Sequence, residues 1–439
     1  MRNENIITCR GYEYISRSSY TMTYLLFPAY LLLFSYLLYV LSARNYIRIS
    51  SRTAIASLVI KVISGCLYGY IFLHYYNGDD TWRYHFQSLQ ETALLKSDPL
   101  RFFTSLFELN NETSYSSVFE SVGSYWKELE YVLLIKLIAL FNIFTGGQYY
   151  TNVICFAFLG FWGGYFFYRL FSTVFKGHER SMAAVFFFFI PMVFWTSGIR
   201  KDGLIFLFMS LIFYHYYFFL QTSQWRRILI IAFSLFMLFL IRSFLALTII
   251  PALLAWGLSV KLKRSPWQIF FGVYGISILL FFLSAYFGPV DFPQKIIDRQ
   301  QEFFRLKGGS EVKLDSLGKG PGTYIMILPQ ALNHVFLRPY PGEQSSFLYR
   351  FSAFETWFCI LILGLAVIYP SPSSRSVFTH PMVMAVLFYG ITNYLLIGYT
   401  IPFLGAIVRY RIIFETLFLA ILLRCIDGKN IPFVRSYIK

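Results

Sequence analysis

The chain has 439 residues, of which 57% are apolar, 21% are aromatic and only 14% are charged. A soluble domain carries about 25% charged residues, so this composition excludes an ordinary soluble protein and indicates an integral membrane protein. The net charge of +16 does not indicate a nucleic-acid partner, because basic loops on one side of a membrane account for it.

Apolar segments of about 20 residues, the length that crosses a bilayer, recur along the chain. We predict an all-α polytopic membrane bundle of about eleven transmembrane helices, near 23–43, 54–76, 150–172, 182–197, 203–220, 228–241, 244–260, 269–286, 351–369, 382–399 and 411–425. The stretch 131–144 is short for a span and contains Lys136, so we expect it not to cross. The first run is too long for a signal-peptide core, so we expect it to remain as an anchor helix.

The predicted spans place the basic loops on one side of the membrane. The residues concerned are Arg44, Arg48, Arg52, Lys176, Arg180, Arg226, Arg227, Lys261, Lys263, Arg264, Arg424, Lys429, Arg435 and Lys439. The positive-inside rule identifies this side as the cytoplasm, with the N-terminus outside and the C-terminus inside. Lys61 is then expected to extend its ammonium toward the inner boundary. We expect one transmembrane domain over 1–439, in which 1–53 forms the anchor helix and a basic loop.

Two long loops, 77–149 and 287–350, are then expected on the outer side. The first opens with adjacent carboxylates, Asp79 and Asp80, directly after an apolar span, and Arg83 and His85 follow. The second contains glycine-rich turns at 307–309 and 318–322, where we expect a mobile backbone. Its later part, 324–335, is predicted to form an amphipathic helix along the membrane surface.

Further ionisable residues recur near the predicted outer boundary. They are Arg200, Lys201, Asp202, Arg242, His334, Arg338, Glu343, Glu355, Arg409, Arg411 and Glu415. Simpler interpretations exist for several of them: Arg411 and Glu415 have the i,i+4 spacing of an ion pair. Asp202 suits a helix start, Arg242 can reach the headgroups, and Glu343 suits a solvated loop. Arginine is nevertheless uncommon in short outer loops, and its guanidinium binds phosphate in bidentate fashion.

Cations beside a pair of carboxylates suit sugar transfer from a phosphorylated lipid. Asp79 or Asp80 would remove the proton from an attacking hydroxyl, with His85 and His334 as further acid/base candidates. Cations would stabilise the departing phosphate, and the candidate ligands are Arg83, Arg200, Lys201, Arg242, Arg338, Arg409 and Arg411. Other site candidates are Asp202, Glu343, Glu355 and Glu415.

A divalent metal, Mg²⁺ or Mn²⁺, is a candidate cofactor on Asp79 and Asp80, although the sequence does not indicate its remaining ligands. The five cysteines are scattered without metal-binding spacing, and all but Cys9 lie in apolar runs. We therefore interpret the cysteines as packing residues.

The order of these features resembles the GT-C superfamily of polyprenyl-phosphate-dependent glycosyltransferases. An acidic pair follows a span and opens a long outer loop; a short apolar helix over 130–144 and the segment FTGG at 144–147 precede the next span. The resemblance covers about residues 54–260 and implies juxtamembrane helices in the outer loops. It also implies a polyprenyl-phosphate-linked sugar donor, a glycan or lipid-linked acceptor, and an active site facing the exterior of a bacterial inner membrane.

Three features depart from that pattern: the additional first helix, 23–43, and the arginine-bearing segments 194–202 and 405–411. These two segments resemble outer segments of bacterial polysaccharide polymerases of the Wzy-like and EpsG-like kinds. The alternative function is therefore a polymerase that joins repeat units carried on lipid diphosphate. A third alternative is a lipid or glycan transporter, although charges that gather at one face argue against transport.

Overall fold

The computed structural model describes residues 17–76, 78–107, 109, 125–287, 290–343 and 346–430. In these residues the regular structure is helical, and β contacts are limited to two isolated bridges. The predicted all-α class is therefore confirmed for the described part of the chain. The expectations for Cys9, Arg435 and Lys439 concern positions outside the described residues.

Among the described residues, nine helical segments are long and apolar enough to cross a membrane. They are Leu25–Ala43, Ser51–Tyr75, Tyr149–Val174, Glu179–Thr196, Lys201–Thr222, Ser243–Leu262, Pro266–Phe287, Phe347–Ile368 and Pro381–Thr400. Each overlaps a predicted span. The other two predicted spans also form helices, α11 (Trp225–Ile241) and α19 (Leu404–Cys425). The chain is therefore a membrane-embedded helical protein.

Two compact units make up the structure. Unit 1 comprises Met1–Leu109, Tyr131–Trp162 and Thr196–Leu204, and unit 2 comprises Asn110–Glu130, Gly163–Trp195 and Ile205–Lys439. Helices α7 (Tyr149–Val174) and α10 (Lys201–Thr222) contribute residues to both units. The acidic pair belongs to unit 1, and the second predicted outer loop belongs to unit 2.

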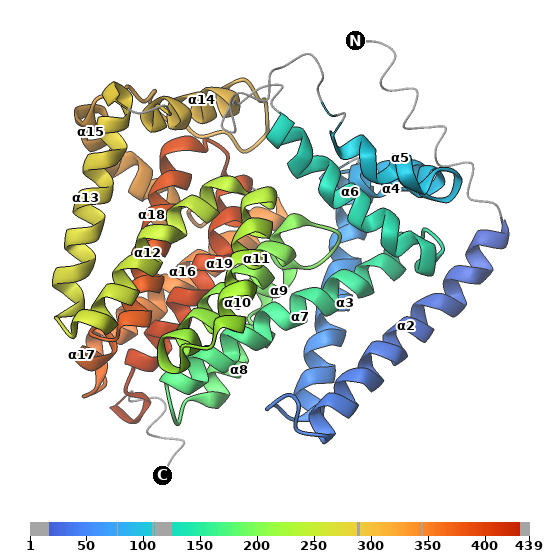
Figure 1. Ribbon diagram of the computed structural model, residues 1–439, viewed down its shortest axis with the longest axis horizontal. Helices are drawn as coiled ribbons and strands as arrows, with labels where there is room; N and C mark the ends of the chain where they lie inside the picture. The colour runs from blue at the N-terminus through green and yellow to red at the C-terminus, as the bar shows by residue number, and fades with distance from the viewer. Residues whose placement is uncertain are drawn as a thin grey trace. The chain divides into compact units, whose positions relative to one another are not determined.

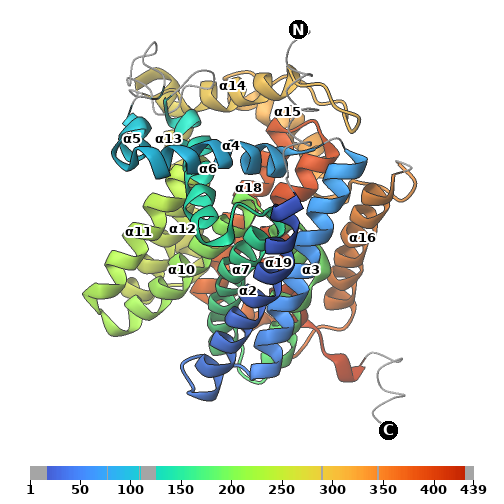
Figure 2. The same cartoon turned by 90° about the vertical axis from the view of Figure 1, so that its right-hand side faces the viewer.

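Unit 1 is built on α3 (Ser51–Tyr75), which begins where the Ser50 side chain accepts a hydrogen bond from the backbone of Thr53. Helix α2 (Arg17–Ala43) packs along α3, and α4 (Asp80–Ser97) lies across one end of α3 (Figures 1 and 2). Short helices α5 (Pro99–Thr104) and η1 (Ser105–Phe107) follow. The Tyr30 hydroxyl of α2 donates to the carbonyl of Phe144 at 2.9 Å, at the end of α6 (Tyr125–Thr145).

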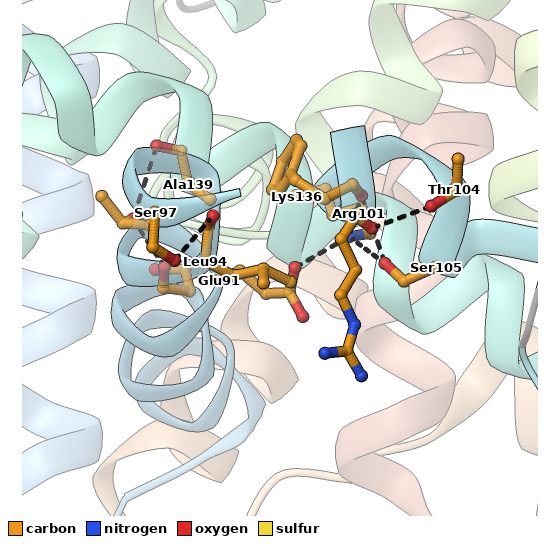
Figure 3. Close-up of polar contacts among 11 residues, drawn as sticks. Glu91, Leu94, Ser97, Arg101, Thr104, Ser105, Lys136 and Ala139 are labelled. Carbon is orange, nitrogen blue, oxygen red and sulfur yellow. Dashed lines mark hydrogen bonds and ion pairs between the residues drawn. The ribbon is translucent and has the colours of Figure 1, made fainter. Parts of the chain in front are cut away.

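A buried lysine joins α4, α5, η1 and α6. The Lys136 ammonium lies 2.7 Å from a Glu91 carboxylate oxygen and donates to the Phe102 carbonyl and the Ser105 hydroxyl, as Figure 3 shows in part. The ammonium also lies 4.1 Å from the centre of the Phe102 ring. Lys136, which shortened the apolar run in the sequence, therefore connects the helices of the first outer loop. Segment 125–145 is not among the nine helices suited to span a membrane in the described residues.

Unit 2 is organised around α18 (Pro381–Thr400), which packs against α12 (Ser243–Leu262), α13 (Pro266–Phe287) and α19. Helices α14 (Phe292–Phe304) and α15 (Pro321–Leu332) lie near one end of α13 and α18 (Figures 1 and 2). The π-helix η2 (Asn333–Leu337) continues α15, and α16 (Phe347–Ile368) packs on α19. The remaining elements are α17 (Ser374–Val377) and η3 (Gly428–Asn430).

The predicted span 182–197 is divided into α8 (Glu179–Phe188) and α9 (Ile190–Thr196). Phe189 between them has the extended backbone angles φ −67° and ψ 102°. The physical reason is Pro191, whose ring removes a backbone donor and opposes a continuous helix at this point. The division leaves a separate short helix, α9, immediately before the turn that contains Arg200.

Hydrogen bonds hold the glycine-rich part of the second predicted loop in place. The fully buried Gln300 amide donates to the carbonyl of Tyr399 at 2.7 Å, and its oxygen accepts from the backbone of Leu317 at 2.8 Å. The backbone of Val312 donates to the carbonyl of Pro402 at 2.7 Å. The predicted helix over 324–335 is present as α15 and η2.

Candidate functional site

The acidic pair of unit 1 lies at the start of α4. Gly78 has a φ of +86°, in the left-handed region that favours glycine, and it allows the chain to turn from α3 into α4. Asp79 is the residue before the helix, and Asp80 is its first residue. Both carboxylates therefore lie where the backbone N–H groups of a helix stabilise negative charge.

A tyrosine of α3 connects the acidic pair to Arg200. The Tyr68 hydroxyl donates to a carboxylate oxygen of Asp79 at 2.7 Å. The Arg200 guanidinium lies 4.4 Å from the centre of the same tyrosine ring, in cation–π contact. Arg200 is 1% exposed and also pairs with Asp202 at 3.3 Å. Asp79, Arg200 and Asp202 therefore belong to one network, and no sequence pattern indicates that Tyr68 joins it.

Asp80 is exposed on one side and lies among cations. The surrounding protein limits hydration of its carboxylate and raises the pKa of Asp80, and the neighbouring Asp79 raises it further. Arg200, Lys201 and Arg83 oppose this effect and so lie close enough to act on the carboxylate. A carboxylate with a raised pKa that still reaches solvent is suited to accept a proton.

One face of α3 contacts the segment 196–200, which precedes α10 and contains Arg200. Lys61, Gly65 and Tyr68 lie at helical spacing, and each contacts the segment 196–200 or its neighbourhood. The Lys61 ammonium donates to the Thr196 hydroxyl at 3.0 Å, and a side chain at Gly65 would meet the backbone nitrogen of Gly198 at 2.7 Å. Lys61 is 1% exposed. The expectation that Lys61 reaches the inner boundary is therefore wrong, because its ammonium hydrogen-bonds inside the protein.

His85 lies inside an aromatic cluster of unit 1. Its ring meets those of Trp82 and Tyr149 edge-on, with centroids 5.8 and 5.4 Å apart, and the side chain is 5% exposed. Burial lowers the pKa of His85 to about 4, so the imidazole is neutral at neutral pH. His85 therefore supports the packing of α4, and its neutral, buried ring is not assigned an acid/base role.

Unit 2 contains a cluster of three arginines and two aromatic rings. Arg242 lies 4.2 Å and Arg409 lies 5.7 Å from the centre of the Tyr410 ring. Arg299 lies 4.4 Å from the centre of the Phe244 ring. Burial lowers the pKa of Arg299; Arg242 also lowers it, while Tyr410 and two glutamates oppose this. Three guanidiniums so close together form a candidate anion-binding site.

The sequence interpretation missed Arg299. It lies on α14, within the predicted outer loop 287–350. The sequence does contain a helix-start signal here, because Asp291 stands at the N-cap position and Pro293 lies in the first turn. What the sequence did not show is that this helix brings Arg299 to Arg242.

Protein groups surround the buried Arg411 guanidinium. Its Nε lies 3.0 Å from a Glu415 oxygen, and one Nη donates to the carbonyls of Val335 and Arg338 at 2.7 and 2.8 Å. The other Nη donates to the Thr356 hydroxyl. The i,i+4 pairing of Arg411 with Glu415 is therefore confirmed, and this arginine is better explained as a structural cross-link than as a phosphate ligand.

The end of the second predicted loop contains His334, Arg338 and Glu343. Arg338 Nε lies 3.4 Å from a Glu343 oxygen, and the other Glu343 oxygen accepts from the backbone of Tyr340 at 2.9 Å. Glu343 is thus an ordered partner of Arg338 within the loop. His334 is 2% exposed, and burial, assisted by Arg338, lowers its pKa to about 4.

Within the residues that the structure describes, no group of three or more His, Cys, Asp or Glu side chains is arranged to hold a metal ion. Asp79 and Asp80 would supply two of the oxygen ligands that Mg²⁺ or Mn²⁺ needs, and the rest would have to come from water or substrate.

The predicted site residues thus fall into clusters within each unit. Unit 1 brings together Asp79, Asp80, Arg83, Arg200, Lys201 and Asp202. Unit 2 contains the arginine cluster and a second group, Arg411, Glu415 and Glu355 with the neighbouring Arg338. Helix α19 contributes residues to both groups. No protein-family model, curated protein or solved structure matches this chain.

Proposed function

We propose that the chain is a membrane glycosyltransferase that transfers a sugar from a polyprenyl-phosphate carrier to a glycan or lipid-linked acceptor. The observation that carries the proposal is the cluster of unit 1, in which Asp79 and Asp80 lie among Arg83, Arg200 and Lys201. A base and a set of phosphate ligands are the two components that such a transfer needs.

In the proposed reaction, the carboxylate accepts a proton and the cations stabilise the leaving phosphate. Asp80 accepts the proton of the acceptor hydroxyl, whose oxygen forms a bond to the anomeric carbon of the donor sugar. The bond between that carbon and the phosphate oxygen breaks, and the polyprenyl phosphate leaves with the electron pair. Arg200 and Lys201 stabilise the negative charge of the leaving phosphate. Tyr68 positions Asp79 and Arg200 through its hydroxyl and its ring.

The proposed location is the outer face of a bacterial inner membrane. The basic loops support this orientation, because they place the acidic pair on the side opposite to the cytoplasm. The first measurement is a mass profile of lipid-linked and surface glycans from cells that produce the wild-type protein, none, Asp80→Asn or Asp315→Asn. Asp315 is a matched control, because its carboxylate is exposed and lies 4.0 Å from the exposed Lys313.

Glycans that lack one sugar in the null strain and in Asp80→Asn, but not in Asp315→Asn, are the expected result. Complete repeat units that accumulate on the lipid would replace the proposal with a polysaccharide polymerase. Unchanged glycans in the null strain would reject both enzymatic functions in that host and leave lipid or glycan transport as the alternative.

The arginine cluster of unit 2 favours the polymerase as the second candidate. A polymerase joins two lipid-diphosphate-linked chains and therefore needs more anion-binding groups than a transferase with one charged substrate. The relevant variants are Arg242→Gln and Arg299→Gln, with the exposed Arg350→Gln as control. If both cluster variants accumulate single repeat units as Asp80→Asn does, the polymerase is the better assignment. Normal glycans in both variants would exclude a role for this cluster.

A further inference from the structure

Two buried glutamates face each other in unit 2. Glu355 is 1% exposed and lies in α16, one of the helices suited to span a membrane; Glu415 is 6% exposed and lies in α19. Both carboxyl oxygens of Glu355 are buried without a hydrogen-bond partner among the described residues, and the Glu415 carboxyl and the Trp195 indole lie near enough to act on them. Carboxylates are rare inside membrane helices, and where they occur they are usually functional.

Arg411 supplies the positive charge of this group. Its Nε lies 3.0 Å from Glu415, while its other N–H groups donate to Thr356 and to the carbonyls of Val335 and Arg338. A guanidinium does not lose its proton in proteins. Arg411 therefore contributes one fixed positive charge, and its direct carboxylate partner is Glu415.

Among the described residues, the other titratable side chains that act on the glutamates are of types that are uncharged at neutral pH. They are Cys359 on α16 and Tyr394 on α18, and the indole of Trp195 on α9 does not titrate. The neighbouring segment η2 contributes backbone carbonyls. Two ionised glutamates against one guanidinium would leave a net negative charge in the protein interior. An uncompensated charge in the interior is strongly unfavourable, and one bound proton removes it.

We propose that Glu355 and Glu415 form a proton-binding site inside the membrane, in which Glu415 stays ionised against Arg411 and Glu355 carries one exchangeable proton. The Glu355 O–H then donates to the Glu415 carboxylate. This arrangement balances the charge and gives both buried carboxyls a hydrogen bond. The site does not depend on the proposed sugar transfer, because the acidic pair of unit 1 takes no part in it.

The proton is linked to the second predicted loop through Arg411. With the proton absent, two carboxylates attract one guanidinium that also holds the carbonyls of Val335 and Arg338. Loss of the proton therefore weakens the attachment of η2, which carries His334. Backbone hydrogen exchange over 333–343 should speed up at high pH beyond its intrinsic pH dependence. Glu355→Gln, which keeps the group neutral, should abolish this extra acceleration.

Dicyclohexylcarbodiimide tests the site, because this apolar reagent modifies protonated carboxyls in membranes. The purified full-length protein is treated with the reagent at several pH values, and modified residues are mapped by mass spectrometry. We expect modification of Glu355 at neutral pH, a decline as the pH rises, and none at the exposed Glu311 and Asp315. Glu355→Gln removes the modification completely.

The Glu415→Gln variant distinguishes two reasons why Glu355 would be protonated: a proton shared with Glu415, or burial of Glu355 alone. In this variant Glu355 is the one remaining carboxyl beside Arg411, so it ionises and its modification is lost although Glu355 is still present. Persistent modification of Glu355 in Glu415→Gln would overturn the proposal. So would protection by Na⁺ at constant pH, which would indicate a bound cation in place of the proton.

Infrared spectroscopy provides a readout that does not depend on access of the reagent. The carbonyl stretch of a protonated, buried carboxyl, which shifts in D₂O, should be present in the wild-type protein and absent from both Glu355→Gln and Glu415→Gln. Size-exclusion profiles that match the wild type identify the variants as folded. Absence of the carbonyl stretch from the wild-type protein at neutral pH would reject the site.

Discussion

At the scale of single residues, the pKa of Asp80 predicts how the rate of the proposed sugar transfer depends on pH. Its pKa is raised because the protein limits its hydration and because Asp79 lies beside it. A base acts only when it is ionised, so activity should fall as the pH drops through this raised pKa. In a pH profile of sugar transfer by purified protein, we expect the acidic limb above the ordinary aspartate value of about 3.9.

The Arg200→Gln variant tests whether Asp80 is the base whose titration produces the acidic limb. Arg200 lowers the pKa of Asp80, so its removal should move the acidic limb of the profile to higher pH as well as reducing the rate. Arg350→Gln, at an exposed position, should leave the limb unchanged. An acidic limb that does not move in Arg200→Gln would mean that another group titrates.

Lys61 is the residue whose role differs most from its sequence interpretation. Lys61→Met keeps most of the side-chain volume but removes the hydrogen bond to Thr196. One hydrogen bond contributes about 1 kcal/mol to stability, so we expect a slightly lower unfolding temperature, and slower sugar transfer because the turn that carries Arg200 is held less firmly. Lys263→Met, in an exposed loop, is the control. A lower unfolding temperature that explains the whole loss of activity would instead make Lys61 a purely structural residue.

At the scale of elements, the contact of α3 with the segment 196–200 depends on a glycine. A side chain at Gly65 would lie 2.6 Å from Val153 and 2.7 Å from the backbone of Gly198. We expect Gly65→Ala to destabilise the protein by about 1–3 kcal/mol, because overpacking displaces well-packed neighbours. Thermal unfolding in detergent measures this effect as a lower transition temperature.

Gly272→Ala in α13 is the matched control, since a side chain there would meet nothing within 4 Å. It should be neutral or slightly stabilising, because alanine favours helices over glycine by up to about 1 kcal/mol. Equal transition temperatures for Gly65→Ala and Gly272→Ala would contradict the close approach of α3 to the turn.

The lengths of the apolar runs predicted most of the long helices, but not which helices contact one another. All eleven predicted spans overlap helices of the structure, because long apolar runs in a membrane have few alternatives to the helix. The division of α8 from α9 at Pro191 was not anticipated. Helix α14 (Phe292–Phe304) also lies inside the predicted loop 287–350, where no helix is predicted over these residues.

At the scale of the whole molecule, the basic loops predict which side of the membrane each loop occupies. A variant whose five cysteines are replaced provides the background for single reporters at Ser97, Ser316 and Ser265. We expect a membrane-impermeant maleimide added to intact cells to label the reporters at Ser97 and Ser316, in the predicted outer loops, and not the one at Ser265. Labelling of Ser265→Cys in intact cells, but not of the other two, would reverse the orientation.

The sequence by itself determined the membrane class, the positions of the apolar helices, and an acidic pair directly after an apolar span, because each depends on neighbouring residues. Only the tertiary structure decided the partners. It brings Tyr68 to Asp79 and Arg200, Lys61 to Thr196, and Arg299 to Arg242. These contacts join residues far apart in the chain, and no local spacing encodes them. Local spacing does not show the surroundings of Glu355 either, because the groups that act on its carboxyl, Glu415, Arg411 and Trp195, lie on other helices.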